Sequence, residues 1–165
     1  KEYKTDFISL MACNIYGHYD HFDAEKSHVI PAILLKFHLA QMRGDDSVKF
    51  WGSGMARREF IYAADLAEIL LDIMSRFTAE NIGLPFINVG SGVDVSIKDL
   101  VMLAKKVTRY CGKILWDVSM PDGMPRKLLD TGIMKKLGIK KPKTALKNGL
   151  KSSYYFFKKH YAANF

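Results

Sequence analysis

A polar loop at residues 12–17 is the first segment whose residue types could do chemistry. It reads Ala12-Cys-Asn-Ile-Tyr-Gly17 and directly follows an apolar run at residues 7–11, which is typical of a strand covered on both faces. Ligands of open α/β sheets bind beyond the carboxyl ends of the strands, so this loop is well placed to contact a cofactor. Its position alone is also compatible with an ordinary polar turn.

A histidine, His28, lies just before an apolar helical pattern that begins at Val29. The positive end of a helix dipole disfavours imidazolium, so a histidine here would have a tuned proton affinity and could move protons. An isolated histidine at the start of a helix more commonly caps it or packs against it. The residues themselves leave both interpretations open.

Positive side chains could bind the phosphates of an anionic ligand, and arginine offers a fork that suits phosphate oxygens. Taken one at a time, however, Lys36, Arg58 and Lys127 are typical of solvated surface charges. Trp51 would ordinarily anchor a core. Asp122 stands in Pro-Asp-Gly, which is a turn sequence.

Strand-like and helix-like segments alternate along the chain, which predicts the α/β fold class. Besides the run at residues 7–11, we expect strands at residues 48–51, 58–62, 85–89 and 113–118. We expect helices from residue 29 to 44, from 65, from 96 to about 111, before 138, and from about 145 to 161. Ser96 and Asp99 have the spacing of a capping box, and Gly112 fits a C-cap. Since no linker or repeat divides the chain, we expect a late strand of a larger sheet followed by one compact lobe.

The composition suits a single domain with a real core, because 48% of the 165 residues are hydrophobic and 12% are aromatic. The chain has 25 Lys and Arg against 17 Asp and Glu, a net charge of +8. This charge would attract nucleic acid, an anionic membrane or a diphosphate metabolite, and it does not choose among them. No apolar stretch reaches the roughly 18 residues that span a bilayer. Cys13 and Cys111 form no Cys-x-x-Cys pair, so we expect no metal site, no disulfide framework and a cytoplasmic setting.

The C-terminal segment mixes lysines with aromatic residues, which could be a nucleic-acid patch. The lysines are Lys147, Lys151, Lys158 and Lys159, and the aromatic residues occupy positions 154–157. We expect instead that the aromatic side chains pack on the lobe while the lysines face water. The sequence therefore favours no nucleic-acid partner.

The loop at residues 12–17 resembles the Pro-x-Asn-x-Tyr-Gly-Pro segment of extended short-chain dehydrogenase/reductases, with Ala12 and His18 in place of the two prolines. Further segments occur in the same order in GDP-L-fucose synthases, and the resemblance covers nearly all of the chain. These segments are Tyr19-Asp-His-Phe22, Ser27-His-Val-Ile-Pro-Ala32, Trp51-Gly-Ser-Gly54, Arg57-Arg-Glu-Phe60, Ile87-Asn-Val-Gly90 and Pro121-Asp-Gly-Met-Pro-Arg-Lys-Leu-Leu-Asp130. The last of them is the most specific.

The resemblance implies a role for each candidate residue. Contacts to the nicotinamide end of NADP(H) are implied for Ala12, Cys13, Asn14, Ile15 and His28. His28 is also the implied general acid of an epimerisation, whose base would be a cysteine upstream of this chain. Binding of the GDP-sugar is implied for Lys36, Trp51, Arg58, Asp122 and Lys127. Arginine is common where Lys36 stands, and lysine keeps the charge but loses the bidentate geometry.

The implied reaction converts GDP-4-keto-6-deoxy-D-mannose to GDP-L-fucose by epimerisation at C3 and C5 and reduction at C4 with NADPH. Residues 1–27 would end a Rossmann-type part, and residues 28–165 would form mainly the sugar-nucleotide lobe of a homodimeric enzyme. The family's glycine-rich loop and its Tyr-xxx-Lys pair are both expected to be absent from these residues, so we expect an upstream half and an inactive isolated chain. Two alternatives stay open: a C4 reductase or epimerase of another nucleotide-linked deoxysugar or heptose, and a non-catalytic sugar-nucleotide-binding fragment.

Overall fold

The computed structural model describes residues 6–23, 26–84 and 86–165, and it is an α/β structure with parallel and mixed sheets, as predicted. The expected strand start at Pro85 lies outside these residues. The strands are β1 (Leu10–Ala12), β2 (Asn14–Tyr16), β3 (Ser47–Trp51), β4 (Arg57–Tyr62), β5 (Ile87–Val89), β6 (Asp94–Ser96), β7 (Lys113–Asp117) and β8 (Arg126–Lys127). The helices are α1 (Val29–Arg43), α2 (Ala63–Arg76), α3 (Ala79–Ile82), α4 (Ile97–Thr108), α5 (Gly132–Lys136) and α6 (Leu146–His160), followed by the 3₁₀ turn η1 (Ala162–Asn164).

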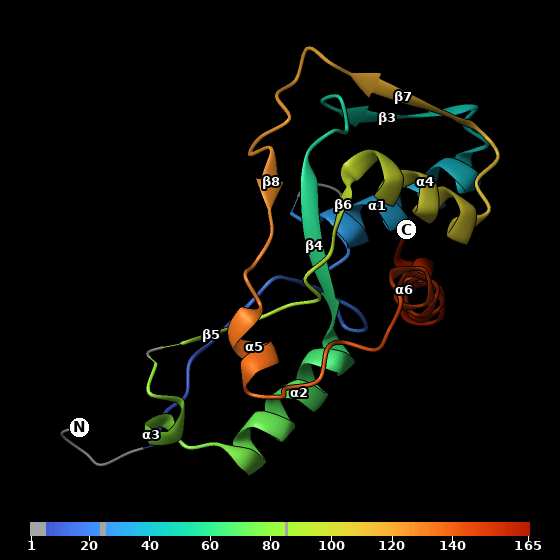
Figure 1. Cartoon of the computed structure of the whole chain (residues 1–165). Coiled ribbons are helices and arrows are strands. Elements are labelled where there is room, and N and C mark those ends of the chain that lie inside the picture. The colour runs from blue at the N-terminus through green and yellow to red at the C-terminus, as the bar shows by residue number, and fades with distance from the viewer. Residues whose placement is uncertain (1–5, 24–25, 85) are drawn as a thin grey trace.

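The strands form three small sheets (Figure 1). At one end of the molecule β1 pairs in parallel with β5, and at the other end β3 pairs in parallel with β7. Between them β4 pairs in parallel with β2 and β8 and antiparallel with β6. The central strand β4 therefore connects the loop at residues 12–17 with the Pro-Arg-Lys segment.

Most helix ends follow from local sequence. Helix α1 ends where Gly44 adopts a left-handed conformation with φ of 72°, and α4 begins at Ser96, whose hydroxyl accepts the amide of Asp99. The predicted C-cap at Gly112 is wrong. Arg109 takes that place with φ of 62°, because α4 ends at Thr108 and the Arg109 amide already closes the last turn on Lys105.

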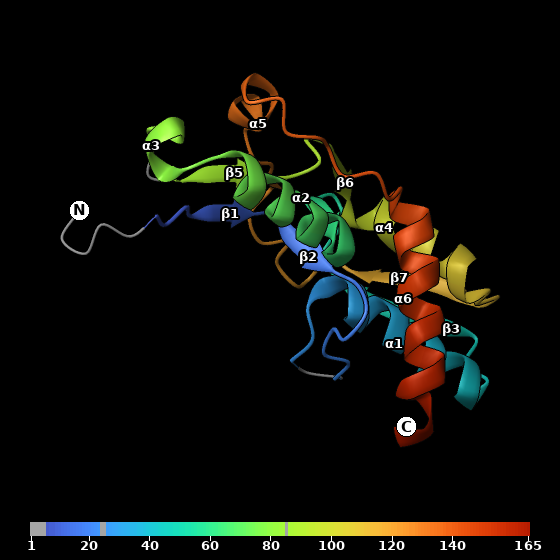
Figure 2. The ribbon, with the colours of Figure 1, turned by 90° about the horizontal axis from the view of Figure 1, so that it is seen from below.

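Two hydrophobic clusters hold these elements. The larger one packs α1, β3, α4 and α6 together, with Leu34, Phe37, Leu100 and Phe157 almost fully buried. The smaller one joins the end of β4 with α2, β5 and α5 and is contacted by Leu10 of β1. Figure 2 shows α6 beside α1 and α4, and β1 and β5 on the far side of α2.

No described helix is long and apolar enough to cross a membrane. Within the same residues, no group of three His, Cys, Asp or Glu side chains is placed to hold a metal ion.

Candidate functional site

The predicted buried strand at residues 7–11 and loop at residues 12–17 are only partly right, because β1 covers Leu10–Ala12, residues 14–16 form β2, and Phe7 and Met11 are exposed. The segment after β1 is anchored from two sides. The Cys13 amide donates to the Val89 carbonyl over 3.1 Å, and the Asn14 side chain donates to the Glu59 carbonyl over 2.7 Å. The first bond continues the β1–β5 pairing and the second adds to the β2–β4 pairing. The segment is therefore part of the sheet, as β2, and is more than a polar turn.

His28 and this loop meet in one cavity of about 270 Å³. Its wall consists of residues 13–16 of the loop, residues 28–31 at the start of α1, and Phe60 of β4. The backbone of His28 serves as the N-cap of α1, but its imidazole makes no capping bond and is exposed. A capping role for the side chain is thus excluded. The predicted cofactor loop and the predicted acid lie side by side.

The turn before His28 is closed by Ser27. Its hydroxyl donates to the His21 carbonyl over 2.7 Å and accepts the Asp23 amide over 2.5 Å. Asp20 lies close enough for an electrostatic interaction with His28. Burial raises the pKa of Asp20, and the His21 amide and the charges of His28 and His21 oppose that rise. Among the described residues, Asp20 Oδ2 is the buried side-chain polar atom without a hydrogen bond.

A second cavity of about 430 Å³ lies next to the first and shares Cys13 and Asn14 with it. Ala12 and Lys127 also line this second cavity. The fold thus places all five predicted cofactor residues and one predicted substrate cation around two adjoining spaces. Residues 12–15 and Lys127 are separated by more than 110 positions in the sequence and are joined through β4 and β8.

Arg57 and Arg58 point in different directions, as expected for neighbours in a strand. Arg57 binds Asp94, with Nε–Oδ1 and Nη2–Oδ1 distances of 2.9 and 2.8 Å. Arg58 instead donates from Nη1 to the Met124 carbonyl over 2.7 Å and lies opposite Lys127 in the β4–β8 ladder. Arg58 therefore helps to hold the strand that carries Lys127, and among the described residues only its Nη1 donates a hydrogen bond.

The other substrate candidates lie farther along the molecule. Trp51 is 70% exposed at the end of β3, so the core position that its type would suggest is wrong. Trp51 and Lys36 line a third cavity of about 550 Å³. The Lys36 ammonium donates to the Lys49 carbonyl over 2.6 Å, and burial lowers the pKa of Lys36.

Asp122 does more than form a turn. Its two carboxylate oxygens accept the amide and the hydroxyl of Ser53, each over 2.6 Å, which lowers the pKa of Asp122. Gly52 is required there, since a Cβ atom would collide with that carboxylate. This contact ties the β3–β4 turn, and with it Trp51, to the loop before β8. Ser53 is a residue that sequence reasoning did not single out.

Glu59 is the other residue that sequence reasoning missed. It is fully buried, and its carboxylate accepts the amides of Gly92 over 2.6 Å and Leu129 over 2.9 Å and the Ser91 hydroxyl over 3.2 Å. A Cβ atom on Gly90 would collide with it. One carboxylate therefore joins β4 to the turn after β5 and to the segment after β8. The available signal in the sequence was an acidic residue directly before the apolar pair Phe60–Ile61, in a segment predicted to be a strand.

The thiol of Cys13 is not poised for chemistry. Burial, and to a lesser extent the charge of Glu59, raise the pKa of Cys13 to about 12. Only the thiolate reacts, so Cys13 is inert at neutral pH. Cys111, by contrast, is exposed.

We accordingly expect a thiol-reactive dye at pH 8 to modify Cys111 quickly and Cys13 at least about 100-fold more slowly. Peptide mapping after timed labelling measures both rates in one sample. A Cys111→Ser variant should show only the slow phase until denaturant is added. Rapid labelling of Cys13 in the folded protein would show that the loop opens and that its thiol is accessible.

A tyrosine and a lysine with the spacing Tyr-xxx-Lys do occur in the chain, at Tyr154 and Lys158 of α6 and again one residue later. They do not belong to the site at His28. Tyr154 is buried, and its hydroxyl faces Gln41 at 3.3 Å and His38 at 3.2 Å. The prediction that Tyr-xxx-Lys is absent from the chain is therefore wrong for the spacing itself, although both pairs lie in α6 and not before residues 12–17.

Comparison with known proteins agrees with this geometry. The NAD dependent epimerase/dehydratase family matches residues 1–90, more than half of the chain. The chain belongs to this family. The matched residues include every residue that lines the cavity at His28, but not Met124 and residues 126–129, which form much of the wall of the adjoining cavity.

Individual members of the family resemble the chain over nearly its whole length. A putative GDP-L-fucose synthase 2 of Arabidopsis thaliana is 42% identical over 156 residues, which are 94% of this chain and 46% of that protein. A GDP-6-OMe-4-keto-L-xylo-heptose reductase from C. jejuni superimposes with a TM-score of 0.87 at 31% identity, over 96% of this chain and 55% of the other. A GDP-L-fucose synthetase from Naegleria fowleri bound to NADP gives 0.84 at 25% identity, over 94% and 47%. The chain spans about half the length of the curated relatives it matches.

Proposed function

We propose that this chain is the C-terminal, sugar-nucleotide-binding part of an NADPH-dependent enzyme that converts GDP-4-keto-6-deoxy-D-mannose to GDP-L-fucose. Residues 1–27 would belong to its Rossmann-type part and residues 28–165 mainly to its substrate lobe. The observation that carries the proposal is the shared cavity of His28 and the loop at residues 13–16. The similarity to a putative GDP-L-fucose synthase over 94% of the chain supports it.

His28 suits the proposed role of proton donor because its imidazole is exposed to the cavity and unused in the fold. The carbonyl at C4 of the sugar acidifies the protons at C3 and C5. A base on one face removes such a proton, and an acid on the other face returns one, which inverts the centre. His28 is the acid in this scheme, and the half-buried carboxylate of Asp20 lies near enough to interact with it electrostatically. The base would be supplied from upstream of this chain.

The cofactor end of the site fits one ring of a dinucleotide. The His28 cavity is below the usual 300–1,000 Å³ of a whole ligand pocket, and its walls include Val29, Ile30 and Phe60. A flat, largely apolar group can enter such a space while Asn14 and His28 offer polar contacts at its rim. We therefore propose that Ala12–Ile15 and His28 hold the nicotinamide end of NADP(H). When bound, NADPH would supply the hydride for reduction at C4.

The diphosphate would meet the cations beyond this cavity. Lys127 lines the adjoining space, and Arg58 keeps Nε and Nη2 free of hydrogen bonds to the described residues. Lys36, Trp51 and Asp122 lie farther along the path from β8 to β3, and we propose that they contact the remainder of the GDP-sugar. Lys36 and Asp122 already make internal hydrogen bonds, so their contribution to affinity should be smaller than that of Lys127.

A related activity is the second candidate. The C. jejuni structure with a TM-score of 0.87 is named a reductase of a GDP-linked 4-keto heptose. An enzyme of that type reduces C4 and needs no acid for inversion. The same cavity could serve it, with His28 in a binding role only.

The two candidates differ in their product. The native protein that carries this chain should be incubated with GDP-4-keto-6-deoxymannose and NADPH in deuterated water, and the product analysed by NMR. GDP-L-fucose with deuterium at C3 and C5 supports the proposed function. A reduced sugar without inversion or deuterium would favour the C4 reductase. No product at all would indicate that the protein binds the sugar nucleotide without converting it.

We further propose that the native enzyme is a cytoplasmic homodimer that binds neither nucleic acid nor membrane. Support comes from the resemblance to soluble sugar-nucleotide enzymes, whose substrates are small anionic metabolites. Sedimentation of the native protein tests the dimer.

A further inference from the structure

The positive charge of the chain is concentrated at its C-terminal end. Residues 131–165 contain nine lysines and no arginine, aspartate or glutamate, a charge of +9. Because the whole chain carries +8, residues 1–130 together carry −1. The site at His28 thus belongs to residues 1–130, which are nearly neutral, and the excess positive charge belongs to residues 131–165.

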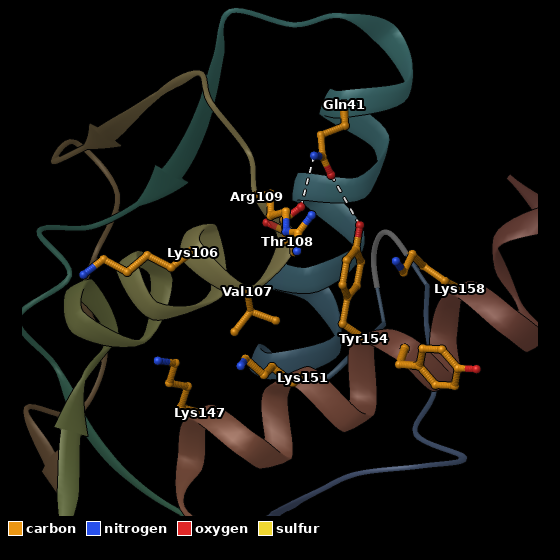
Figure 3. A pocket seen from close by; sticks show the side chains of 10 residues that line it. Gln41, Lys106, Val107, Thr108, Arg109, Lys147, Lys151, Tyr154 and Lys158 are labelled. Carbon is orange, nitrogen blue, oxygen red and sulfur yellow. Dashed lines mark hydrogen bonds between the residues drawn. The ribbon is translucent and has the colours of Figure 1, made fainter.

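Three of these nine lysines line a groove between α4 and α6 that shares no residue with the cavities at His28 (Figure 3). The groove has a volume of about 810 Å³, and five cations line it: Lys106 and Arg109 from the end of α4, and Lys147, Lys151 and Lys158 from α6. No acidic residue lines it. Tyr154 stands between the two helices with its hydroxyl toward Gln41, and Gln41 in turn binds the Thr108 carbonyl.

These cations have no counter-charge within the described chain. The ion pairs there join Lys49, Arg57, Arg76, Arg126 and Lys143 to acids, and none involves a cation of the groove. Lysines 140, 141 and 143 of the same basic segment lie instead beside Asp65, Glu68 and Asp72. The groove thus brings five unpaired cations together with no acid among its lining residues, whereas lysines 140, 141 and 143 have acids beside them.

The beginning of α6 shows the same imbalance. The helix has no side-chain N-cap and no acid in its first turn, and Lys147 occupies that turn. A cation there opposes the helix dipole, whose positive end favours an anion. The field also reaches His38, whose pKa is lowered by burial and, second, by Lys158. Five positive charges thus line one groove. The N-terminus of α6, where Lys147 lies, would itself favour a negative charge.

We propose that the groove between α4 and α6 is a second ligand site, which binds a compact anion of the polyphosphate class with three or more negative charges. Lysine presents a point charge with three donors, which suits terminal phosphate oxygens of variable geometry. The volume lies in the range of small-ligand pockets. Such a site, distant from His28, would let a phosphate-rich metabolite bind without occupying the substrate pocket.

The surroundings of the groove favour a compact anion over an extended polymer. An extended nucleic acid needs a basic track with stacking aromatic side chains. Here Tyr154 and Phe157 are buried, Phe156 stacks on His18, and the next basic stretch is balanced by acids. Only Tyr155 of this aromatic run is largely exposed.

Calorimetric titration of the native protein that carries this chain, with inorganic tripolyphosphate as the ligand, tests the site. The groove variant carries Lys147→Gln, Lys151→Gln and Lys158→Gln. A matched control removes the same charge elsewhere, by Lys135→Gln, Lys136→Gln and Lys140→Gln. We expect the groove variant to lose about tenfold or more in affinity and the control less than about twofold, because direct charge-assisted contacts outweigh distant charge. Circular dichroism and thermal melting verify that both variants are folded.

Four results would overturn the proposal: no binding to the unmodified chain, equal losses in both variants, loss of binding in a Lys127→Gln variant, or tighter binding of an RNA oligomer or anionic vesicles through the same lysines. Equal losses would mean a general charge effect. Loss in Lys127→Gln would place the anion in the substrate pocket, and tighter binding of RNA or vesicles would identify an extended partner. Retained binding in Lys127→Gln, with loss in the groove variant alone, supports the second site independently of the proposed enzyme activity.

Discussion

Replacing His28 with glutamine in the native enzyme is expected to lower formation of the epimerised product by about 10²–10⁴-fold, the usual contribution of a positioned proton donor. Glutamine can keep a hydrogen bond at the cavity but cannot deliver a proton at neutral pH. The fold should be unaffected, because the N-cap contact of His28 is made by its backbone and its side chain is exposed. Melting temperature and product formation are measured on the same preparations.

Solvent deuterium separates the role of His28 from that of the base. Exchange at C3 or C5 of the substrate should persist in the variant, since the base still removes protons, while the inverted product falls. His21→Gln is the matched control, because His21 lies in the same turn but lines neither of the adjoining cavities. An unchanged rate of product formation in His28→Gln would mean that His28 only binds, as in the C4-reductase alternative.

Replacing Glu59 with alanine is expected to destabilise the chain by about 3–5 kcal/mol, since it leaves the Gly92 and Leu129 amides without their charged acceptor. For a chain of this size the melting temperature should fall by about 10–15 °C. The cavity left by the side chain adds to the loss. Chemical denaturation measures the free energy of unfolding directly.

Two further variants make this result specific. Glu59→Gln keeps the shape of the side chain but turns an NH₂ group toward amide donors. Its free energy of unfolding should therefore lie between those of the unmodified chain and the Glu59→Ala variant. Glu68→Ala removes an exposed carboxylate paired with Lys143 and should cost less than about 1 kcal/mol. A Glu59→Ala chain as stable as the unmodified one would show that this carboxylate does not hold the two segments together.

Much of the local structure could be predicted from the sequence. The apolar spacing from Val29 and the glycine at position 44 gave α1, and the pairing of Ser96 with Asp99 gave the start of α4. Such features depend on residues a few positions apart, and their energies are local. The short strands β2, β6 and β8 and helix α3 were not predicted, since segments of two to four residues show no period.

The sequence by itself determined the α/β class and the residue types available for chemistry, because hydrophobic periodicity, caps and motif wording are local properties of the chain. Only the tertiary structure decided which of those residues meet. It paired β1 with β5 across about 75 positions and placed His28 against the loop at residues 13–16. It also brought Arg57 within hydrogen-bond distance of Asp94 and Arg58 within that of the Met124 carbonyl. It buried the Glu59 carboxylate where two backbone amides donate to it. These contacts depend on how strands distant in sequence pack around β4, and no short window of residues contains that information.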